Sequence, residues 1–267
     1  MKATEGVGLA EVNAVYDGAE GELWELTMGQ QIHIGGFQSS MDLADRADIG
    51  AEQRGVDLCY CNGAGMRFLV RFRGVASMVG VDATKKVVER GERLSHEEGL
   101  ADRIRFVLAD VCDSGLPDAE ADFVWGEDAW CYVDDKPKLI AEAARIVKPG
   151  GVIAFTDWVE GPAGLSEPEA ELFLQGMKFA NVQDIEGYRN LLEKNGCEVI
   201  EAEDTGRFAP SVDLYLNMVE MQLTYDALRI LDFDAERLDT IATGFRFFRD
   251  LAHDGKIAQG RFIARKR

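Results

Sequence analysis

The stretch GVDLCYCNGAGMRFLVRF, residues 55–72, decides the fold. A short, mainly apolar segment leads into a glycine-containing turn, and an apolar segment with helical spacing follows. This order is typical of a nucleotide-binding strand, turn and helix. Two positions of the turn that usually carry small, bare residues carry Cys59 and Cys61 instead. The turn is therefore a working cofactor loop, a modified one or an inactive one. The other motifs of the chain are needed to distinguish these three alternatives.

Strands and helices alternate along the chain from residue 55 onward. Apolar segments predict strands, and the segments between the early ones have helical spacing, above all residues 84–99 and 138–147. Because strands that alternate with helices pair in parallel, the pattern predicts a doubly wound, Rossmann-like α/β sheet that binds its ligand beyond the carboxyl ends of the strands. Seven strands are expected, at residues 56–58, 76–82, 104–110, 121–126, 152–157, 197–205 and 260–264.

The 267 residues are enough for one large domain with additional segments. Residues 1–50 are predicted to form an N-terminal helical cap that closes the ligand site. Residues 51–165, 196–210 and 257–267 are predicted to form the core. Two mostly helical segments are inserted around the sixth strand and are predicted to form a lid or substrate subdomain, residues 166–195 and 211–256.

Charge and composition disfavour several classes of partner. Lys and Arg number 29 and Asp and Glu number 48, which gives a formal net charge of −19. Basic residues gather only in the short clusters Lys85-Lys86 and Arg265-Lys266-Arg267, so nucleic acid and anionic membranes are disfavoured. No apolar run approaches the ~18 residues of a membrane helix, and the N-terminus lacks a secretory signal. Five cysteines show no disulfide framework, and we expect a reducing, cytoplasmic location.

An acidic residue stands at the predicted carboxyl end of each of the first five strands. Asp is common at strand ends, so one such residue alone means little. Together, on one edge of the sheet, these acids predict a ligand site. An acid after the second strand can accept the hydroxyls of a ribose, and one after the third can accept the amine of a base, so we expect an adenosine-containing ligand. The residues are Asp57, Asp82, Asp110, Glu127 with Asp128, and Asp157.

The turn after the first strand argues against a dinucleotide. Pyrophosphate lies close against backbone N–H groups, which is why nicotinamide-binding turns have the spacing G-x-G-x-x-G. Here glycine stands only at Gly63 and Gly65, and the Cys59 and Cys61 side chains would crowd a phosphate. A ligand without a phosphate tolerates such a turn better.

With these motifs in order, the sequence resembles the class I S-adenosylmethionine-dependent methyltransferases, and within them the sarcosine/dimethylglycine N-methyltransferases. The resemblance extends over essentially the whole chain, and ARIVKPGGVIAFTD (144–157) is its most specific stretch. It implies a seven-stranded sheet whose last strand is inserted antiparallel. The other matching stretches are QIHIGGF (31–37), VDLCYCNGAGMRFLV (56–70), GLADRIRFVLADV (99–111), ADFVWGEDAW (121–130) and DGKIAQGRFIARK (254–266).

The resemblance implies S-adenosylmethionine as cofactor, S-adenosylhomocysteine as its product and a small-molecule methyl acceptor. The methionine part of the cofactor would lie on the glycine turn, the ribose at Asp82 and the adenine at Asp110. Tyr16 and His33 would close the site from the N-terminal side, and no metal ion is implied. The cofactor-binding residues predicted in this way are Tyr16, His33, Asp57, Cys59, Cys61, Gly63, Asp82, Ala83, Asp110, Val111 and Glu127.

The sequence departs from the family pattern at two places. Cys59 and Cys61 stand at the first and second glycines of the turn, and Cys61, the more unusual, is expected to weaken cofactor binding unless the loop shifts. Relatives often carry a His shortly after the fourth strand, and Tyr132 stands in its place. Either Tyr132 takes over the role of that His, or the substrate needs no strong base.

Methyl transfer from a sulfonium is an in-line displacement, which requires alignment of a neutral lone pair and exclusion of water. We predict Tyr132, His33 and Trp130 as catalytic residues. The rings of Trp130, Tyr132 and Trp158 can stabilise a cation, and core or lid packing is the alternative for each. For His33 the alternative is a hydrogen-bonded loop histidine.

Acidic residues at the predicted mouth suit a cationic or zwitterionic amine better than a phosphate ester. An amino-acid substrate would also need a cation for its carboxylate, and Lys178 and Arg189 in the predicted lid are the weak candidates. A solvated lid face is the alternative for both. The predicted mouth acids are Glu127, Asp128, Asp157 and Glu160.

The sequence thus predicts a small-molecule methyltransferase that acts on the amine nitrogen of a substrate like glycine, sarcosine or dimethylglycine. An O- or C-methyltransferase of a natural product and a catalytically inactive binding protein of the same fold are the alternatives. Thiols on the cofactor edge of the sheet would also suit a soft metalloid substrate, although buried cysteines commonly serve as small apolar residues. A homodimer joined through the lid is compatible with the pattern.

Overall fold

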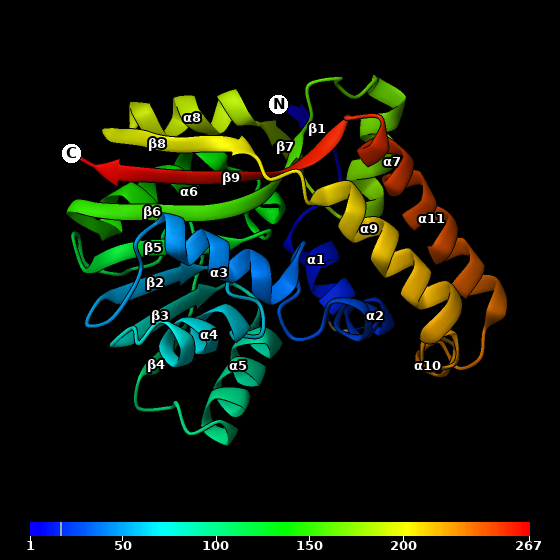
Figure 1. The fold of residues 1–267 in the computed structure, drawn as a ribbon, viewed down its shortest axis with the longest axis horizontal. Helices are drawn as coiled ribbons and strands as arrows, with labels where there is room; N and C mark the ends of the chain where they lie inside the picture. The colour runs from blue at the N-terminus through cyan, green and yellow to red at the C-terminus, as the bar shows by residue number, and fades with distance from the viewer. Residues whose placement is uncertain (17) are drawn as a thin grey trace.

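The computed structural model describes residues 1–16 and 18–267 and confirms the doubly wound α/β fold (Figure 1). The main strands lie in the order β4-β3-β2-β5-β6-β9-β8. The first five of these run parallel, and β9 is inserted antiparallel between β6 and β8, as expected. The strands are β2 (Arg54–Leu58), β3 (Ser77–Asp82), β4 (Ile104–Leu108), β5 (Ala121–Glu127), β6 (Val147–Glu160), β8 (Cys197–Asp204) and β9 (Ile257–Lys266).

Two further short strands lie beside the end of β6, in segments that the sequence predicts to be helical. β7 (Asn181–Asp184) pairs in parallel with the last residues of β6, and β1 (Lys2–Ala3) pairs antiparallel with β7. Both are too short for an alternating apolar pattern to be recognised. They join the N-terminal segment to the end of β6.

Helices cover both faces of the sheet (Figure 1). On one face Leu69 packs with Phe123, and on the other Ile140 and Leu192 pack with Val124. Each face therefore has its own apolar core. The first face carries α3 (Gly36–Arg46), α4 (Ala64–Phe72) and α5 (Lys85–Glu97), and the second carries α6 (Lys136–Ile146) and α8 (Ile185–Lys194).

Helix α8 lies in the segment 166–195 that the sequence assigns to the lid, but it packs against β8 and α6. Its Tyr188 and Leu192 side chains are fully buried in the sheet core. Core helices and lid helices both bury one apolar face, so their sequence spacing does not separate them.

The other helices gather beyond the carboxyl ends of the parallel strands, to the right of the sheet in Figure 1. Their apolar core includes Trp158, Phe173 and Phe208. No described helix is both long and apolar enough to cross a membrane. This group contains α1 (Leu9–Tyr16), α2 (Ala19–Met28), α7 (Glu167–Met177), α9 (Phe208–Asn217), the π-helix η2 (Met218–Gln222), α10 (Thr224–Ile230) and α11 (Ala235–His253), and a single 3-10 turn, η1 (Trp130–Tyr132), follows β5.

Close packing at the centre of the sheet explains the glycine that opens the stretch quoted first. A Cβ atom on Gly55 would lie 2.2 Å from Cζ of Phe123 and 2.6 Å from Sδ of Met78. Because both distances are far shorter than a van der Waals contact, a side chain here would displace neighbouring residues of β5 and β3. Gly55 thus allows three adjacent strands and their core side chains to pack closely.

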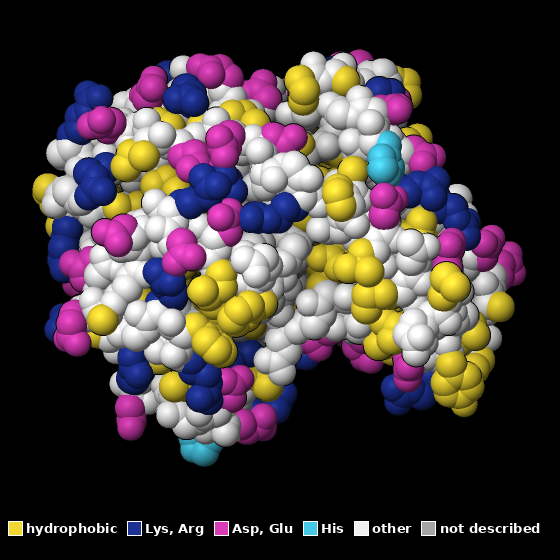
Figure 2. Space-filling model, in the orientation of Figure 1, with side chains coloured by type: hydrophobic (Ala, Val, Ile, Leu, Met, Phe, Trp, Pro, Cys, Tyr) yellow, Lys and Arg dark blue, Asp and Glu magenta, His cyan; other side chains and the backbone are white. Residues whose placement is uncertain are grey.

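Acidic and basic side chains are interspersed over the face of the molecule drawn in Figure 2. Many charged side chains of the described chain form ion pairs, such as Arg46 with Asp42 at 3.1 Å and Arg145 with Asp118 at 2.6 Å. Exposed pairs of this kind contribute little to stability. The charge pattern of this face therefore gives no indication of a ligand.

Candidate functional site

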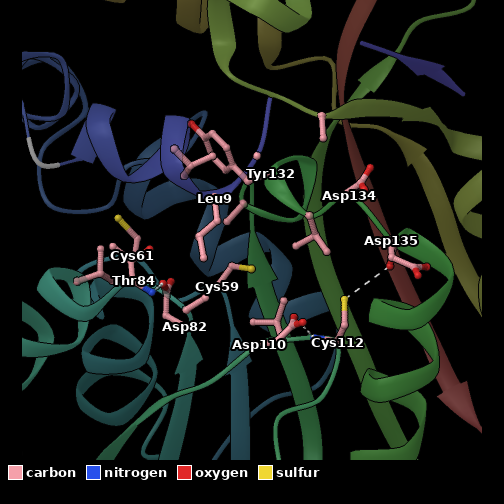
Figure 3. Close-up of a pocket in the computed structure, with 18 of the residues that line it drawn as sticks. Leu9, Cys59, Cys61, Asp82, Thr84, Asp110, Cys112, Tyr132, Asp134 and Asp135 are labelled. Carbon is pink, nitrogen blue, oxygen red and sulfur yellow. Dashed lines mark hydrogen bonds between the residues drawn. The ribbon is translucent and has the colours of Figure 1, made fainter. Parts of the chain in front are cut away.

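A cavity of about 730 Å³ opens at the carboxyl ends of the parallel strands, beneath helix α1. Its walls come from the turns after β2 and β3, the segment after β4, the η1 turn and α1 (Figure 3). The parallel strands thus bring together side chains that are far apart in sequence. Of the residues predicted from the sequence, the walls contain Tyr16, Cys59, Cys61, Asp82, Ala83, Asp110, Val111 and Tyr132.

The turn after β2, residues 59–63, keeps the backbone geometry of a glycine turn. Cys59, Cys61 and Gly63 have φ values of 63°, 53° and 78°, all in the left-handed region. A side chain in this region costs ~1–2 kcal/mol per residue, because its Cβ crowds the following carbonyl. The two cysteines therefore occupy glycine positions of the turn at the cost of strain. We call residues 59–63 the cofactor turn.

Buried hydrogen bonds hold the cofactor turn from behind. Asn62 Nδ2 donates to the Gln30 carbonyl at 2.9 Å, and Asn62 Oδ1 accepts the Ala64 N–H at 3.0 Å. The buried Arg67 guanidinium donates to the Asn62 carbonyl at 2.7 Å and to Gln30 Oε1 at 2.8 Å. It also donates to Glu98 at 2.8 Å. These bonds offset the strain of the turn. No sequence pattern marks Arg67 or Asn62, because both reach Gln30 from a distant part of the chain.

Asp82 presents a carboxylate to the cavity at the end of β3. Its Oδ1 accepts the Thr84 N–H at 2.9 Å. Burial raises the pKa of Asp82 to about 6, although hydrogen bonds from the Thr84, Cys61 and Ala83 backbone favour the charged form. Beside it, Ala83 and the buried Val111 provide apolar surface. A half-buried acid next to an apolar wall is the arrangement that a ribose and a base require.

A second predicted acid, Asp110, lies at the cavity mouth and is exposed. Its Oδ1 accepts the Cys112 N–H at 2.9 Å, which fixes the direction of the carboxylate. Asp110 lies beside Cys112 in the cavity wall (Figure 3). Asp110 therefore provides an acceptor at the rim, whereas Asp82 provides one inside.

Four buried polar residues form a cluster on the far side of the cofactor turn. Ser40 Oγ donates to Glu127 Oε1 at 2.7 Å, and His33 Nε2 lies 3.3 Å from the same oxygen. Burial, together with the charges of Glu127 and Asp82, raises the pKa of Asp57 well above its ordinary value. His33, Asp57 and Glu127 line a small cavity of about 30 Å³ that shares Cys59 and Cys61 with the large one. The two cysteine side chains thus stand between the two cavities.

Two tyrosines form the wall opposite the cofactor turn. Their hydroxyl groups lie 3.3 Å apart, and the edge of one ring meets the face of the other, with centroids 5.9 Å apart. Burial raises the pKa of both Tyr16 and Tyr132. Tyr132 also packs edge-on against Phe179 at 4.9 Å. Both phenols therefore keep their protons at neutral pH.

Trp130 lies in the sheet core and not in the cavity wall, in contrast to its predicted catalytic position. Its side chain is fully buried, its indole N–H donates to the Leu58 carbonyl at 3.1 Å, and its ring stacks on Phe155 at 4.0 Å. Trp158 is likewise buried, edge-on to Phe208 at 4.6 Å. Both rings make the contacts of core packing, which is the alternative interpretation stated above.

The acids of the cavity mouth differ from those predicted. Asp128 is buried, and it accepts the Ile34 N–H at 2.7 Å and the Gln259 amide at 2.8 Å. Asp157 is also buried, and neither residue faces the cavity. Position at a strand end did not reveal which acids point inward. The acidic side chains that do line the cavity, besides Asp82, are Asp110, Asp113, Asp134 and Asp135.

Lys138 is the basic residue in the cavity wall, and its ammonium lies 2.9 Å from Asp135 Oδ2. The two cations predicted in the lid segment lie elsewhere. Lys178 donates to the Gln175 carbonyl at 2.9 Å, and Arg189 lies on α8, 3.5 Å from Glu186. The lining of the cavity is therefore strongly acidic.

All five cysteines are free thiols. Burial raises the pKa of both Cys61 and Cys112, which line the cavity, to about 12. Cys131 is buried and donates to the Asp128 carbonyl at 3.5 Å. Among the residues that the structure describes, no cluster of three or more His, Cys, Asp or Glu side chains is arranged to hold a metal ion.

Comparison with known proteins identifies similar proteins over nearly the whole chain. Residues 56–155 match the family model described as a methyltransferase domain. Phosphoethanolamine N-methyltransferase 3 from Arabidopsis thaliana is 25% identical over 236 residues, which cover 88% of this chain and 46% of that protein. The chain thus spans about half the length of the curated relatives it matches first.

Solved structures share the fold. A candidate sarcosine dimethylglycine methyltransferase from Galdieria sulphuraria is similar with a TM-score of 0.76 and 25% identity, over 86% of this chain and 85% of that one. Phosphoethanolamine N-methyltransferase 2 from Haemonchus contortus, solved with phosphomonomethylethanolamine and S-adenosylhomocysteine, is similar with a TM-score of 0.85 and 21% identity, over 95% of this chain and 58% of that one.

Proposed function

We propose that this chain, a member of the class I S-adenosylmethionine-dependent methyltransferases, transfers a methyl group from S-adenosylmethionine to the amine nitrogen of a small molecule. The observation that carries the proposal is the cavity at the strand ends, where the Asp82 carboxylate meets the cofactor turn beside the apolar Ala83 and Val111. The named N-methyltransferases among the similar proteins support the choice of nitrogen.

The residues present fit the adenosine part of the cofactor. Asp82 would accept both ribose hydroxyls, and Ala83 and Val111 would flank the base, with Asp110 near its amine. The methionine part would follow the cofactor turn toward Asp57 and Glu127. The free space there is about 30 Å³, so the fit is tightest beside Cys59 and Cys61.

The cofactor supplies an electrophilic methyl group on a sulfonium. The protein must align the acceptor nitrogen and exclude water, and the paired Tyr16 and Tyr132 form the wall suited to both tasks. Because burial raises the pKa of Tyr132, its phenol donates a hydrogen bond and does not act as a base. The ring faces can stabilise positive charge. A proton lost by the amine would pass to the carboxylates of the mouth or to water.

The acidic lining supports a cationic or zwitterionic amine and disfavours a phosphate ester. Asp113, Asp134 and Asp135 would repel a phosphate, and the one cation in the described wall, Lys138, is paired with Asp135. Glycine, sarcosine and dimethylglycine have the required charge and size. Their carboxylate would compete with Asp135 for Lys138.

The predicted cap and lid remain part of the proposal. Leu9, Val12 and Tyr16 of α1 line the cavity, which supports residues 1–50 as a cap over the cofactor. The helices in residues 211–256 would form the lid and, through it, a homodimer. The proposal that the cavity binds the cofactor and the methyl acceptor depends neither on movement of the lid nor on dimer formation.

Calorimetric titration with S-adenosylmethionine and S-adenosylhomocysteine, followed by a screen of methyl acceptors with a homocysteine-coupled readout, tests the proposal. We expect binding of both ligands and turnover with glycine, sarcosine or dimethylglycine, but not with phosphoethanolamine. Absence of binding at millimolar concentration would refute a methyltransferase. Turnover of hydroxyl or carbon acceptors alone would refute N-methylation, and binding without any turnover would favour an inactive binding protein.

Cofactor affinity should fall in acid because Asp82 must be ionised to accept two ribose hydroxyls. Its pKa of about 6 in the free protein means that a proton competes with the ligand below that pH and not above it. From pH 8 to pH 5 we expect the Kd of S-adenosylhomocysteine to rise about tenfold, as one carboxylate becomes protonated. Calorimetry across this range measures the change. Asp82→Asn, which carries no titrating group there, should bind weakly with a much flatter pH profile.

A further inference from the structure

Lys136, at the start of α6, is a lysine whose side chain is completely buried. Its ammonium donates to the carbonyl of Cys131 at 3.4 Å and to the carbonyl of Val133. These two carbonyls belong to the residues on either side of Tyr132. Burying a lysine costs free energy of folding because the charged ammonium loses its contacts with water. The hydrogen bonds to the two carbonyls offset part of this cost.

Asp157, near the end of β6, holds the same turn from the other side. Its carboxylate is buried and accepts the Cys131 N–H at 2.9 Å. The Tyr188 hydroxyl donates to the second oxygen at 2.5 Å and so fixes the carboxylate. The positive charge of Lys136 lies close enough to act on Asp157 electrostatically. The backbone around Tyr132 is thus hydrogen-bonded at the Cys131 N–H, the Cys131 carbonyl and the Val133 carbonyl.

We propose that Lys136 and Asp157 are positioning residues that fix the η1 turn so that Tyr132 faces Tyr16 across the methyl-transfer cavity. Neither side chain lines the cavity, so both act through Tyr132. Three backbone anchors leave the turn little freedom, which keeps the Tyr132 ring in one place relative to the cofactor. The inference deepens the proposed function and rests on it only for the catalytic consequence.

The position of Tyr132 can be followed by 19F NMR without any turnover. The protein contains six tyrosines, and in protein labelled with 3-fluorotyrosine the resonance lost in Tyr132→Phe identifies the ring. We expect Lys136→Met to shift or broaden this resonance and, with an acceptor from the screen, to lower kcat at least tenfold. The Kd of S-adenosylhomocysteine should stay within twofold, because the adenosine contacts lie at other strands.

Two matched comparisons separate positioning from general loss of stability. Ile140→Ala removes most of a fully buried side chain from the same helix, and it should leave the Tyr132 resonance and kcat unchanged at a similar loss of thermal stability. Asp157→Asn keeps an oxygen that can accept the Cys131 N–H and should retain the resonance, whereas Asp157→Leu should lose it. The Asp157 pair decides the matter if Lys136→Met fails to fold.

An unchanged Tyr132 resonance in both Lys136→Met and Asp157→Leu would overturn the proposal. Equal loss of kcat in Ile140→Ala and Lys136→Met would also overturn it, because a structural role alone would then account for the effect. If no acceptor is found in the screen, the proposed function fails while the NMR comparison still tests whether the two residues position Tyr132.

Discussion

Replacing Asp82 by alanine is expected to weaken the binding of S-adenosylhomocysteine by about 100-fold to 10,000-fold. In the proposed complex this carboxylate accepts two ribose hydroxyls inside a cavity where little water remains to replace it. Hydrogen bonds to a charged group contribute about 1.5–3 kcal/mol each, and a factor of ten corresponds to 1.4 kcal/mol. Isothermal titration calorimetry at pH 8, where Asp82 is ionised, measures the loss.

Asp113→Ala is the matched control for this variant. Asp113 also lines the cavity but is exposed, so its removal tests the general effect of lost negative charge at the mouth. We expect its Kd to stay within about twofold of the parent, since exposed charges interact weakly. If Asp82→Ala bound as tightly as Asp113→Ala, the ribose would not lie at β3 and the adenosine assignment of the cavity would be wrong.

We expect the double variant with glycine at positions 59 and 61 to be more stable than the double variant with alanine there. Its free energy of unfolding should be higher by about 2 kcal/mol. At ordinary backbone angles the order is the reverse, because glycine loses more conformational freedom on folding. Cys59 and Cys61 have φ values of 63° and 53°, where a Cβ atom is strained, so the double glycine variant avoids a cost that the double alanine variant retains. Urea unfolding of the two double variants measures the difference.

The same pair of variants tests crowding of the cofactor. Both remove the thiols that stand between the two cavities, so both should bind S-adenosylmethionine more tightly than the parent, by about tenfold for the glycine variant. Cys112 lines the same cavity with an ordinary backbone conformation, so Cys112→Ala should be more stable than Cys112→Gly. A double alanine variant more stable than the double glycine variant would show that the turn carries no strain.

Much of the fold could be predicted from the sequence because parallel strands leave a repeating signal. All seven expected strands form, and the antiparallel insertion of β9 follows the resemblance. Asp82 could be placed for the same reason, since the end of the second strand of such a sheet is fixed by topology. Strand ends, however, do not determine which way a side chain points. Asp128 and Trp130 follow β5, Asp157 lies near the end of β6, and none of the three lines the cavity.

The parts that could not be predicted depend on contacts between distant segments. Arg67 joins the cofactor turn to the Gln30 side chain, and Asp157 joins β6 to the η1 turn, through hydrogen bonds that no sequence pattern marks. The lid boundary at α8 is a further case, because Tyr188 and Leu192 have the spacing of any amphipathic helix. The spacing of apolar residues along a helix shows that one face of the helix is buried. It does not show which other element covers that face.

The cysteines of the cofactor turn also offer a route to selective chemical inhibition. Family members with glycines in the turn have no nucleophile at these positions, whereas Cys59 and Cys61 place two thiols in the cavity wall. Their raised pKa makes them slow to react with electrophiles free in solution. An adenosine analogue with a mild electrophile attached to its sugar would hold the reactive group beside them at high effective concentration. Covalent capture would then discriminate this protein from relatives whose binding pocket is otherwise the same.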